Sequence, residues 1–368
     1  MLDVDAVLGD PGVRIVVCCG SGGVGKTTTA AALALRAAER HGRRTVVLTI
    51  DPARRLAQSL GLTELDNTPR LVMSGPDGGE LHAMMLDMKR TFDDVVLTHT
   101  APDRAAEIFA NPFYQAMSST FSGTQEYMAM EKLGQLRAAE EWDLIVVDTP
   151  PSRSALDFLD APARLGRFLD GRMLRMFMAP ARAGGRSVFN LVTASFGVFS
   201  KVVQKVLGAQ LLTDLSGFVS ALDSTFGGFR ERAERTYQAL QHPQTAFVLV
   251  AVPEPDAVRE AAYFAERLNA ERMPLAGLVL NRVHGSTVPE LTSQESIDAA
   301  EKLRDEHPLT ASVLDVHALV MRKVARESEV SARFTDEFPH VPIAYVPAQP
   351  TDVHDLAGLR SIVAALTG

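Results

Sequence analysis

One octapeptide constrains the fold of this 368-residue chain more than any other segment: Gly20, Ser21, Gly22, Gly23, Val24, Gly25, Lys26 and Thr27. Its spacing is G-x-x-x-x-G-K-[ST], in which glycines let successive backbone N–H groups turn toward an anion with no Cβ in the way. The octapeptide follows an apolar, β-branched run at residues 13–19 and precedes an alanine-rich stretch at residues 28–40, which predict a buried strand and a helix. Because that helix directs its positive end toward the same anion, the segment predicts a phosphate-binding loop.

Side chains at the end of this loop have predicted roles toward a nucleotide. Lys26 is expected to neutralise charge on the β- and γ-phosphates, and the Thr27 hydroxyl is expected to bind Mg²⁺. Thr28 opens the following helix and belongs to the same predicted binding set. The expected ligands are therefore ATP and Mg²⁺.

Apolar runs alternate with helical stretches along most of the chain. Seven runs predict strands, at residues 13–19, 45–50, 81–86, 144–147, 247–252, 275–280 and 341–346. Strands joined by helices form a largely parallel sheet that is covered on both faces. The predicted fold class is therefore α/β, with a doubly wound, mostly parallel sheet of P-loop NTPase type. Residues 151–240 contain no convincing strand, which indicates a helical subdomain inserted into the sheet.

The inserted helical subdomain is predicted at about residues 161–240 with part of residues 100–120, and the P-loop core at residues 1–100, 120–160 and 241–368. Apolar residues, Met173 and Met176 among them, recur in it at three- and four-residue spacing. Between residues 161 and 210 there are eight basic residues and one acidic residue, in a chain of net charge −8. This pattern favours a groove for an apolar client helix or membrane protein, or a surface for anionic membrane. A core-facing stripe with a solvated basic face is the alternative interpretation.

Two aspartates directly follow predicted strands. Asp51 follows the second strand, and Asp148 follows the strand at residues 144–147. Carboxyl ends of parallel strands meet at one edge of the sheet, so both carboxylates are expected beside the phosphate-binding loop. One would orient or deprotonate the attacking water and the other would hold Mg²⁺ and its waters, which makes both candidate metal ligands together with Thr27. The alternative is that each aspartate caps a helix.

Three segments together resemble the arsenical-pump ATPase and tail-anchored-protein targeting family, within the deviant-Walker-A class of P-loop ATPases. They are the glycine-dense loop, Asp51-Pro52-Ala53 and Asp148-Thr149-Pro150-Pro151. The resemblance implies a dimeric, Mg²⁺-dependent ATPase. It also implies that Asp51 positions the attacking water and that Asp148 reports the γ-phosphate.

The resemblance further implies a base-binding site near two later strands. Asn281 matches the position whose side-chain amide reads adenine, and Pro347 falls where the family flanks the base. An isolated asparagine at a strand end is otherwise usually a turn residue. The resemblance therefore adds Asn281 and Pro347 to the residues that are predicted to bind the nucleotide.

The chain departs from that family at Ser21. The class carries a lysine at this position, which reaches across a dimer to the nucleotide of the partner subunit, and a serine supplies no such charge. Slow hydrolysis in isolation, or a heteromer with a paralogous ATPase that provides the lysine, is expected; a homodimer is the alternative. The paired C-x-x-C clasp of some targeting factors is also missing, because the only cysteines are Cys18 and Cys19. These adjacent residues are expected in the core.

Three functions are compatible with these features. The first is an ATP-hydrolysing dimeric switch whose helical lobe binds an apolar client or a membrane-associated partner. The alternatives are an energising subunit of an anion-extrusion system and a positioning ATPase of the partition type. The net charge of −8 predicts no nucleic-acid partner. The N-terminus is acidic and lacks the apolar stretch of a secretory signal peptide, which predicts a cytoplasmic location. Peripheral association with the membrane is compatible with this location.

Overall fold

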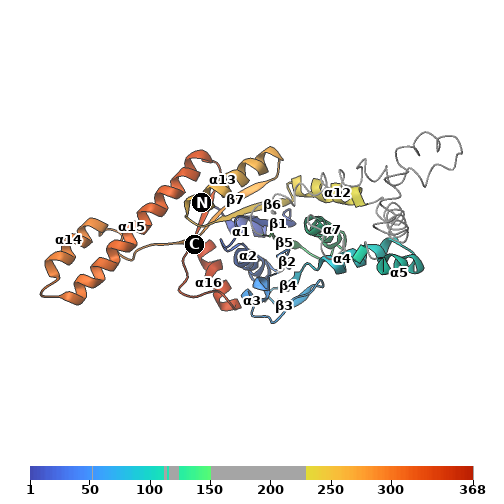
Figure 1. Cartoon of the computed structure of the whole chain (residues 1–368), viewed down its shortest axis with the longest axis horizontal. Helices are drawn as coiled ribbons and strands as arrows, with labels where there is room; N and C mark the ends of the chain where they lie inside the picture. Colours follow the sequence, from blue (N-terminus) through green and yellow to red (C-terminus); the bar gives the residue numbers. More distant parts are fainter. Residues whose placement is uncertain (52, 112–113, 116–123, 151–228, 368) are drawn as a thin grey trace, which may run out of the picture. The chain divides into compact units, whose positions relative to one another are not determined.

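The computed structural model describes residues 1–51, 53–111, 114–115, 124–150 and 229–367 (Figure 1). Contacts within these residues divide them into two units. The first comprises residues 1–85, 136–150 and 239–367, and the second comprises residues 86–135 and 229–238 where they are described. The apolar and basic stretch between residues 161 and 222, with Met173 and Met176, lies outside the described residues. The boundaries expected for the helical subdomain therefore stay a prediction.

The first unit is built on one eight-stranded sheet in the order β3-β4-β2-β5-β1-β6-β7-β8. The strands are β1 Ile15–Cys19, β2 Arg44–Thr49, β3 Arg70–Ser74, β4 Glu80–Met85, β5 Leu144–Asp148, β6 Thr245–Ala251, β7 Leu275–Val283 and β8 Ile343–Pro347. Every neighbouring pair is parallel except β3 and β4. The predicted mostly parallel α/β sheet is confirmed, and all seven predicted strands are present with ends displaced by at most three residues. Edge strand β3 was not predicted.

Helices connect these strands. The helices of the first unit are α1 Val4–Gly9, α2 Lys26–His41, α3 Arg55–Ser59, α13 Pro255–Ala270, α14 Ser293–Leu303, α15 Pro308–Glu337 and α16 Leu356–Thr367. In the second unit lie α4 Met88–His99, α5 Pro102–Ala110 and most of α7 Thr124–Ala138 and α12 Phe229–Gln241. No helix in the part of the chain that the structure describes has both the length and the apolar character that a membrane crossing requires.

Helix α2 packs on the sheet through small side chains. Its buried positions are mostly alanine, which lets the helix approach β1, β2 and β5 closely, and α16 packs beside it (Figure 1). Strands β1 and β5 are buried along their whole length, as expected where both faces of a parallel sheet are covered. Cys18 and Cys19 are buried in β1, as predicted for core residues. This packing fixes the start of α2, and with it the phosphate-binding loop, against the carboxyl end of β1.

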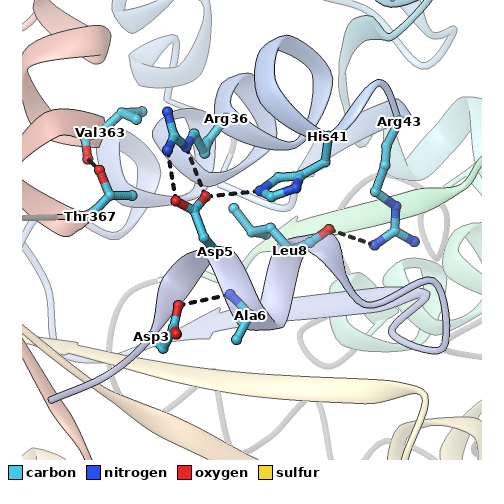
Figure 2. Close-up of polar contacts among 9 residues, drawn as sticks. All are labelled: Asp3, Asp5, Ala6, Leu8, Arg36, His41, Arg43, Val363 and Thr367. Carbon is cyan, nitrogen blue, oxygen red and sulfur yellow. Dashed lines mark hydrogen bonds and ion pairs between the residues drawn. The ribbon is translucent and has the colours of Figure 1, made fainter.

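The N-terminal helix α1 is tied to α2 by a charged cluster. Asp3 caps α1 by accepting a hydrogen bond from the backbone N–H of Ala6 at 2.8 Å. Asp5 accepts two hydrogen bonds from Arg36, at 2.9 and 2.7 Å, and lies 2.9 Å from Nε2 of His41 (Figure 2). The Arg36 guanidinium lowers the pKa of Asp5 to about 2. The sequence places these charges on two separate helices, and the fold brings them together.

Candidate functional site

The glycine-rich loop joins β1 to α2 and has a backbone that requires glycine. Gly20, Gly23 and Gly25 have φ values of 154°, 78° and 97°, a region that L-residues other than glycine rarely adopt. A Cβ on Gly20 would lie 2.0 Å from the carbonyl oxygen of Val250. Gly22 and Gly23 are exposed, whereas Val24 is buried in the core beneath the loop. The buried Val24 therefore holds the loop in place, while Gly22 and Gly23 leave its other side accessible, as a phosphate-binding loop requires.

Lys26 folds back over this loop. Its Nζ donates a hydrogen bond to the backbone oxygen of Ser21 at 2.7 Å, and the residue is buried. Burial lowers the pKa of Lys26, while the nearby carboxylates of Asp148 and Asp51 oppose that shift. The loop lysine is thus held above the turn that would surround a phosphate. The Ser21 hydroxyl is also buried and has no hydrogen-bond partner among the described residues.

Asp148 lies at the centre of the site. The last residue of β5, it is fully buried, and its Oδ2 accepts hydrogen bonds from the hydroxyls of Thr27 and Thr49, both at 2.8 Å. Burial raises the pKa of Asp148 to about 6, although both hydroxyls and Lys26 act in the opposite direction. The adjacent Thr149 donates its hydroxyl to the carbonyl oxygen of Cys18 at 2.8 Å, which fixes the end of β5 against β1. The structure therefore brings together Thr27 and Asp148, as the sequence predicted.

The donor set at this point fits a magnesium ion. Mg²⁺ prefers hard oxygen ligands and is usually held by one or two carboxylates or hydroxyls together with water and substrate phosphates. Thr27 and Asp148 supply a hydroxyl and a carboxylate that already contact each other. The second oxygen of Asp148, Oδ1, is buried without a hydrogen-bond partner in the described residues. An orphaned buried carboxylate oxygen is costly unless a cation or water satisfies it.

Asp51 lies two residues beyond the end of β2, because this strand ends at Thr49, one residue before its predicted end. Its backbone N–H donates to the hydroxyl of Thr49 at 3.2 Å, so Asp51 and Asp148 share a hydrogen-bonding partner. Its Oδ1 accepts a hydrogen bond from the N–H of Ala53 at 2.9 Å, and its Oδ2 lies 3.5 Å from Nη1 of Arg55. Asp51 does not cap α3, because the N-cap residue of this helix is Arg54 and no side chain caps it. Pro52, between these residues, lies outside the described part of the chain.

Asn281 links the sheet to the phosphate-binding loop. Its Nδ2 donates to the carbonyl oxygen of Val24 at 2.9 Å, and its Oδ1 accepts from the N–H of Arg282 at 2.9 Å. Arg282 has a φ of 59°, and the pairing of β7 with β8 shifts register here. Asn281 therefore contacts the loop directly. Pro347 ends β8 and pairs with Val283 of β7. The adenine-binding roles of Asn281 and Pro347 stay predictions.

Two contacts of the site were not predicted from the sequence. Thr49 was assigned only to a strand, although an inward-facing hydroxyl at the end of β2 can reach the next parallel strand. Arg54 and Arg55 follow Asp51 closely in the sequence, where an arginine can contact phosphate but more often lies on a helix surface. The ion pair of Arg55 with Asp51 was not predicted, although their spacing of four residues is the signal that could have indicated it. Thr28, which was predicted, lies half-buried in the first turn of α2.

Comparison with known proteins agrees with this geometry. A family model described as anion-transporting ATPase matches residues 13–315 of the chain. The chain is 26% identical over 326 residues to ATPase GET3B of Arabidopsis thaliana, which covers 80% of this chain and 71% of that protein. It is 24% identical over 361 residues to ATPase ARSA2 of Chlamydomonas reinhardtii, covering 94% and 91%. It is 32% identical over 178 residues to Protein Rv2184c of Mycobacterium tuberculosis, covering 43% and 39%.

Proposed function

Since this chain belongs to the anion-transporting ATPase family, and is therefore an ATPase, we propose that ATP hydrolysis operates it as a dimeric switch. In this proposal nucleotide binding closes two subunits, and the predicted helical lobe holds or releases an apolar client or a membrane-associated partner. The observation that supports it most is the contact of Asp148 with Thr27. Asp148 reports on the phosphate site, and the chain runs on from the same strand end into residues 151–228, where the lobe is expected.

The residues of the site have separate roles in the proposed reaction. Backbone N–H groups of the loop and Lys26 hold the phosphates and stabilise charge on the transferred γ-phosphoryl group. Thr27 and Asp148 would hold Mg²⁺, which supplies charge neutralisation at the phosphates when bound. Asp51 orients the attacking water and accepts its proton. Asn281 holds the loop in position through its hydrogen bond to Val24 and would lie beside the base.

A second candidate function is favoured by the family description. An energising subunit of an anion-extrusion system would use the same hydrolysis to drive a membrane transporter, and anion transport is the activity in the description of the matching family. The two functions differ in what stimulates turnover. In the anion-extrusion subunit, the extruded anion would accelerate hydrolysis. In the dimeric switch, a captured apolar helix would accelerate it. A positioning ATPase of the partition type is the third possibility, and DNA or lipid dependence would distinguish it.

The partner subunit is proposed from Ser21. Because a serine supplies no positive charge to the partner's nucleotide, the proposed dimer is a heteromer with a paralogous ATPase that carries a lysine there, or else a homodimer that compensates otherwise. The proposed location is cytoplasmic, with peripheral contact to anionic membrane through the basic stretch between residues 161 and 210. Neither partner is a nucleic acid in this proposal.

The test of this function is Mg·ATP hydrolysis by the purified chain, with the mass measured in each nucleotide state. Lys26→Ala is the control for the loop, and Ser21→Lys restores the missing charge. We expect slow turnover in wild type, loss in Lys26→Ala and an increase in Ser21→Lys. Fast turnover by a strict homodimer of wild type would overturn the heteromer, and turnover that is indifferent to Lys26→Ala would overturn the site itself.

The client-binding half of the proposal needs its own measurement. Replacing Met173 and Met176 by Asp is expected to abolish binding of an apolar helix or of anionic liposomes while ATP affinity is retained. Unchanged client binding would contradict a role for this stretch. A loss of folding, detected by thermal unfolding, would instead support the alternative that these methionines belong to a core.

A further inference from the structure

The phosphate-binding loop carries one cationic side chain, Lys26, because a serine stands at position 21. The transferred phosphoryl group carries charge on three oxygens, and enzymes of this chemistry usually place more than one cation around it. Besides Lys26 and the proposed Mg²⁺, a second cationic side chain must come either from another subunit or from elsewhere in this chain. The segment that follows Asp51 contains such a group.

Arg55 is the first residue of α3 and lies directly beside the proposed water-positioning residue. Its Nη1 is 3.5 Å from Oδ2 of Asp51, while the other oxygen of Asp51 accepts the N–H of Ala53. Asp51 is in turn connected through Thr49 to Asp148. The guanidinium is therefore attached to the same network of residues that surrounds the phosphate site.

The ion pair of Arg55 with Asp51 is readily exchanged. The Arg55 side chain is 58% exposed, against 13% for Asp51, and ion pairs with one partner in water add little net stability. A phosphate offers more charge than a single carboxylate, and its oxygens match the fork of donors on a guanidinium. An ATP γ-phosphate near Asp51 would therefore compete successfully for Arg55.

We propose that Arg55 is a second phosphate-binding cation of this site, contributed by the same chain, which leaves Asp51 for the γ-phosphate when ATP binds. The exchange has two effects. It adds positive charge where Ser21 supplies none, and it frees the Oδ2 atom of Asp51 to orient water. This inference rests on the proposed function, because it assumes that ATP occupies the glycine-rich loop with its γ-phosphate toward Asp51.

The test compares the affinities of the full chain for Mg·ADP and for Mg·AMP-PNP, a non-hydrolysable ATP analogue, by titration calorimetry. Arg55→Ala is expected to weaken AMP-PNP binding on the order of tenfold and to leave ADP binding within about twofold, because only the analogue carries a γ-phosphate. Arg55→Lys is expected to retain part of the preference, since it keeps the charge and loses the fork. Binding is the readout, so the result does not depend on the turnover rate.

Arg54→Ala is the matched control. It removes the same charge from the neighbouring exposed position, so it should leave the ratio of the two affinities unchanged. An Arg55→Ala ratio equal to that of wild type would overturn the assignment of Arg55 alone, as would an equal loss in Arg54→Ala. If wild type binds neither nucleotide, or if Lys26→Ala binds both normally, the proposed function fails and this inference fails with it. Thermal unfolding without nucleotide confirms that each variant is folded.

Discussion

Thr27 donates a hydrogen bond of 2.8 Å to Asp148, although 121 positions separate the two residues in the chain. Thr27 lies in the first turn of α2, and Asp148 is the last residue of β5. The same carboxylate oxygen accepts the hydroxyl of Thr49 at the end of β2. One buried carboxylate oxygen thus joins α2, β5 and β2 at the carboxyl ends of the parallel strands, where the phosphate-binding loop lies.

Removing the Thr27 hydroxyl should separate metal-dependent from metal-independent nucleotide binding. Thr27→Val keeps the size and removes the hydroxyl, so we expect ATP hydrolysis to fall on the order of 10²-fold and ATP affinity to lose most of its response to Mg²⁺. Titration of ATP with and without Mg²⁺ measures this response. Thr27→Ser keeps the hydroxyl and should remain close to wild type. Equal behaviour of the two variants would show that the hydroxyl is not used.

The glycines of the loop should differ in their tolerance of a methyl group. Gly20→Ala places a Cβ 2.0 Å from a backbone oxygen of β6, which cannot move without opening the sheet, so we expect a loss of about 3 kcal/mol or more in the free energy of unfolding. Gly23→Ala meets no atom within 4 Å and should lose only about 1–2 kcal/mol, the cost of its positive φ. Urea denaturation without nucleotide measures both. Similar losses would contradict the contact between Gly20 and Val250.

Most of this site follows from two rules that need no structure. The spacing of the loop predicts the roles of Lys26 and Thr27, and the meeting of parallel strands at their carboxyl ends predicts that Asp148 lies beside them. Both rules depend on backbone geometry that every parallel α/β sheet shares. The neighbourhood of Thr27 and Asp148 was therefore predictable from the sequence.

Two features that the sequence did not predict are an exposed edge strand and a long-range side-chain contact. Strand β3 is half exposed and pairs antiparallel at the edge, so its short apolar run, which includes Leu71, lacks the pattern of a buried strand. Asn281 contacts Val24 at the point where the pairing of β7 with β8 shifts register, and no sequence pattern specifies such a shift. Residues 151–228 lie outside the described chain, so the predictions for the lobe are untested.

Asp5 should make stability dependent on pH in acid. Its pKa is about 2 in the folded chain, below the usual value near 3.8, because Arg36 favours the carboxylate. A lowered folded pKa adds stability that is complete above the unfolded pKa and is lost as the pH falls from about 4 to 2. Because the Asp5 side chain is 37% exposed, we expect Asp5→Asn to cost only about 1 kcal/mol at pH 7.

Urea denaturation at pH 7, 4 and 2.5 measures this difference between wild type and Asp5→Asn. The difference in the free energy of unfolding between the two proteins should narrow below pH 4 and fall to about a third of its pH 7 value at pH 2.5. Asp3→Asn is the control on the same helix, since it removes a charge but keeps an oxygen that can cap Ala6. A gap that stays constant with pH would show that Asp5 acts through packing rather than through its charge.

Arg43 is a buried cation whose hydrogen-bond acceptors are backbone carbonyls. Its Nη1 donates to the carbonyl oxygen of Leu8 at 3.0 Å (Figure 2). The same Nη1 donates to the carbonyl oxygen of Asp10 at 3.2 Å. Its Nη2 donates to Val13 at 2.6 Å and to the carbonyl oxygen of Asp143. The side chain thus fastens the end of α1 and the start of β1 to the loop before β5.

Arg43→Ala should therefore be strongly destabilising, with a loss of about 3 kcal/mol or more in the free energy of unfolding. Several carbonyl groups lose their donor at once, and a buried acceptor without a partner is costly. Arg44→Ala is the matched control. Arg44 pairs with Glu80 at 3.0 Å and lies over the Trp142 ring, but its side chain is 45% exposed, so about 1 kcal/mol or less is expected. If the two adjacent arginines cost the same in urea denaturation, charge removal rather than the loss of carbonyl contacts would explain both.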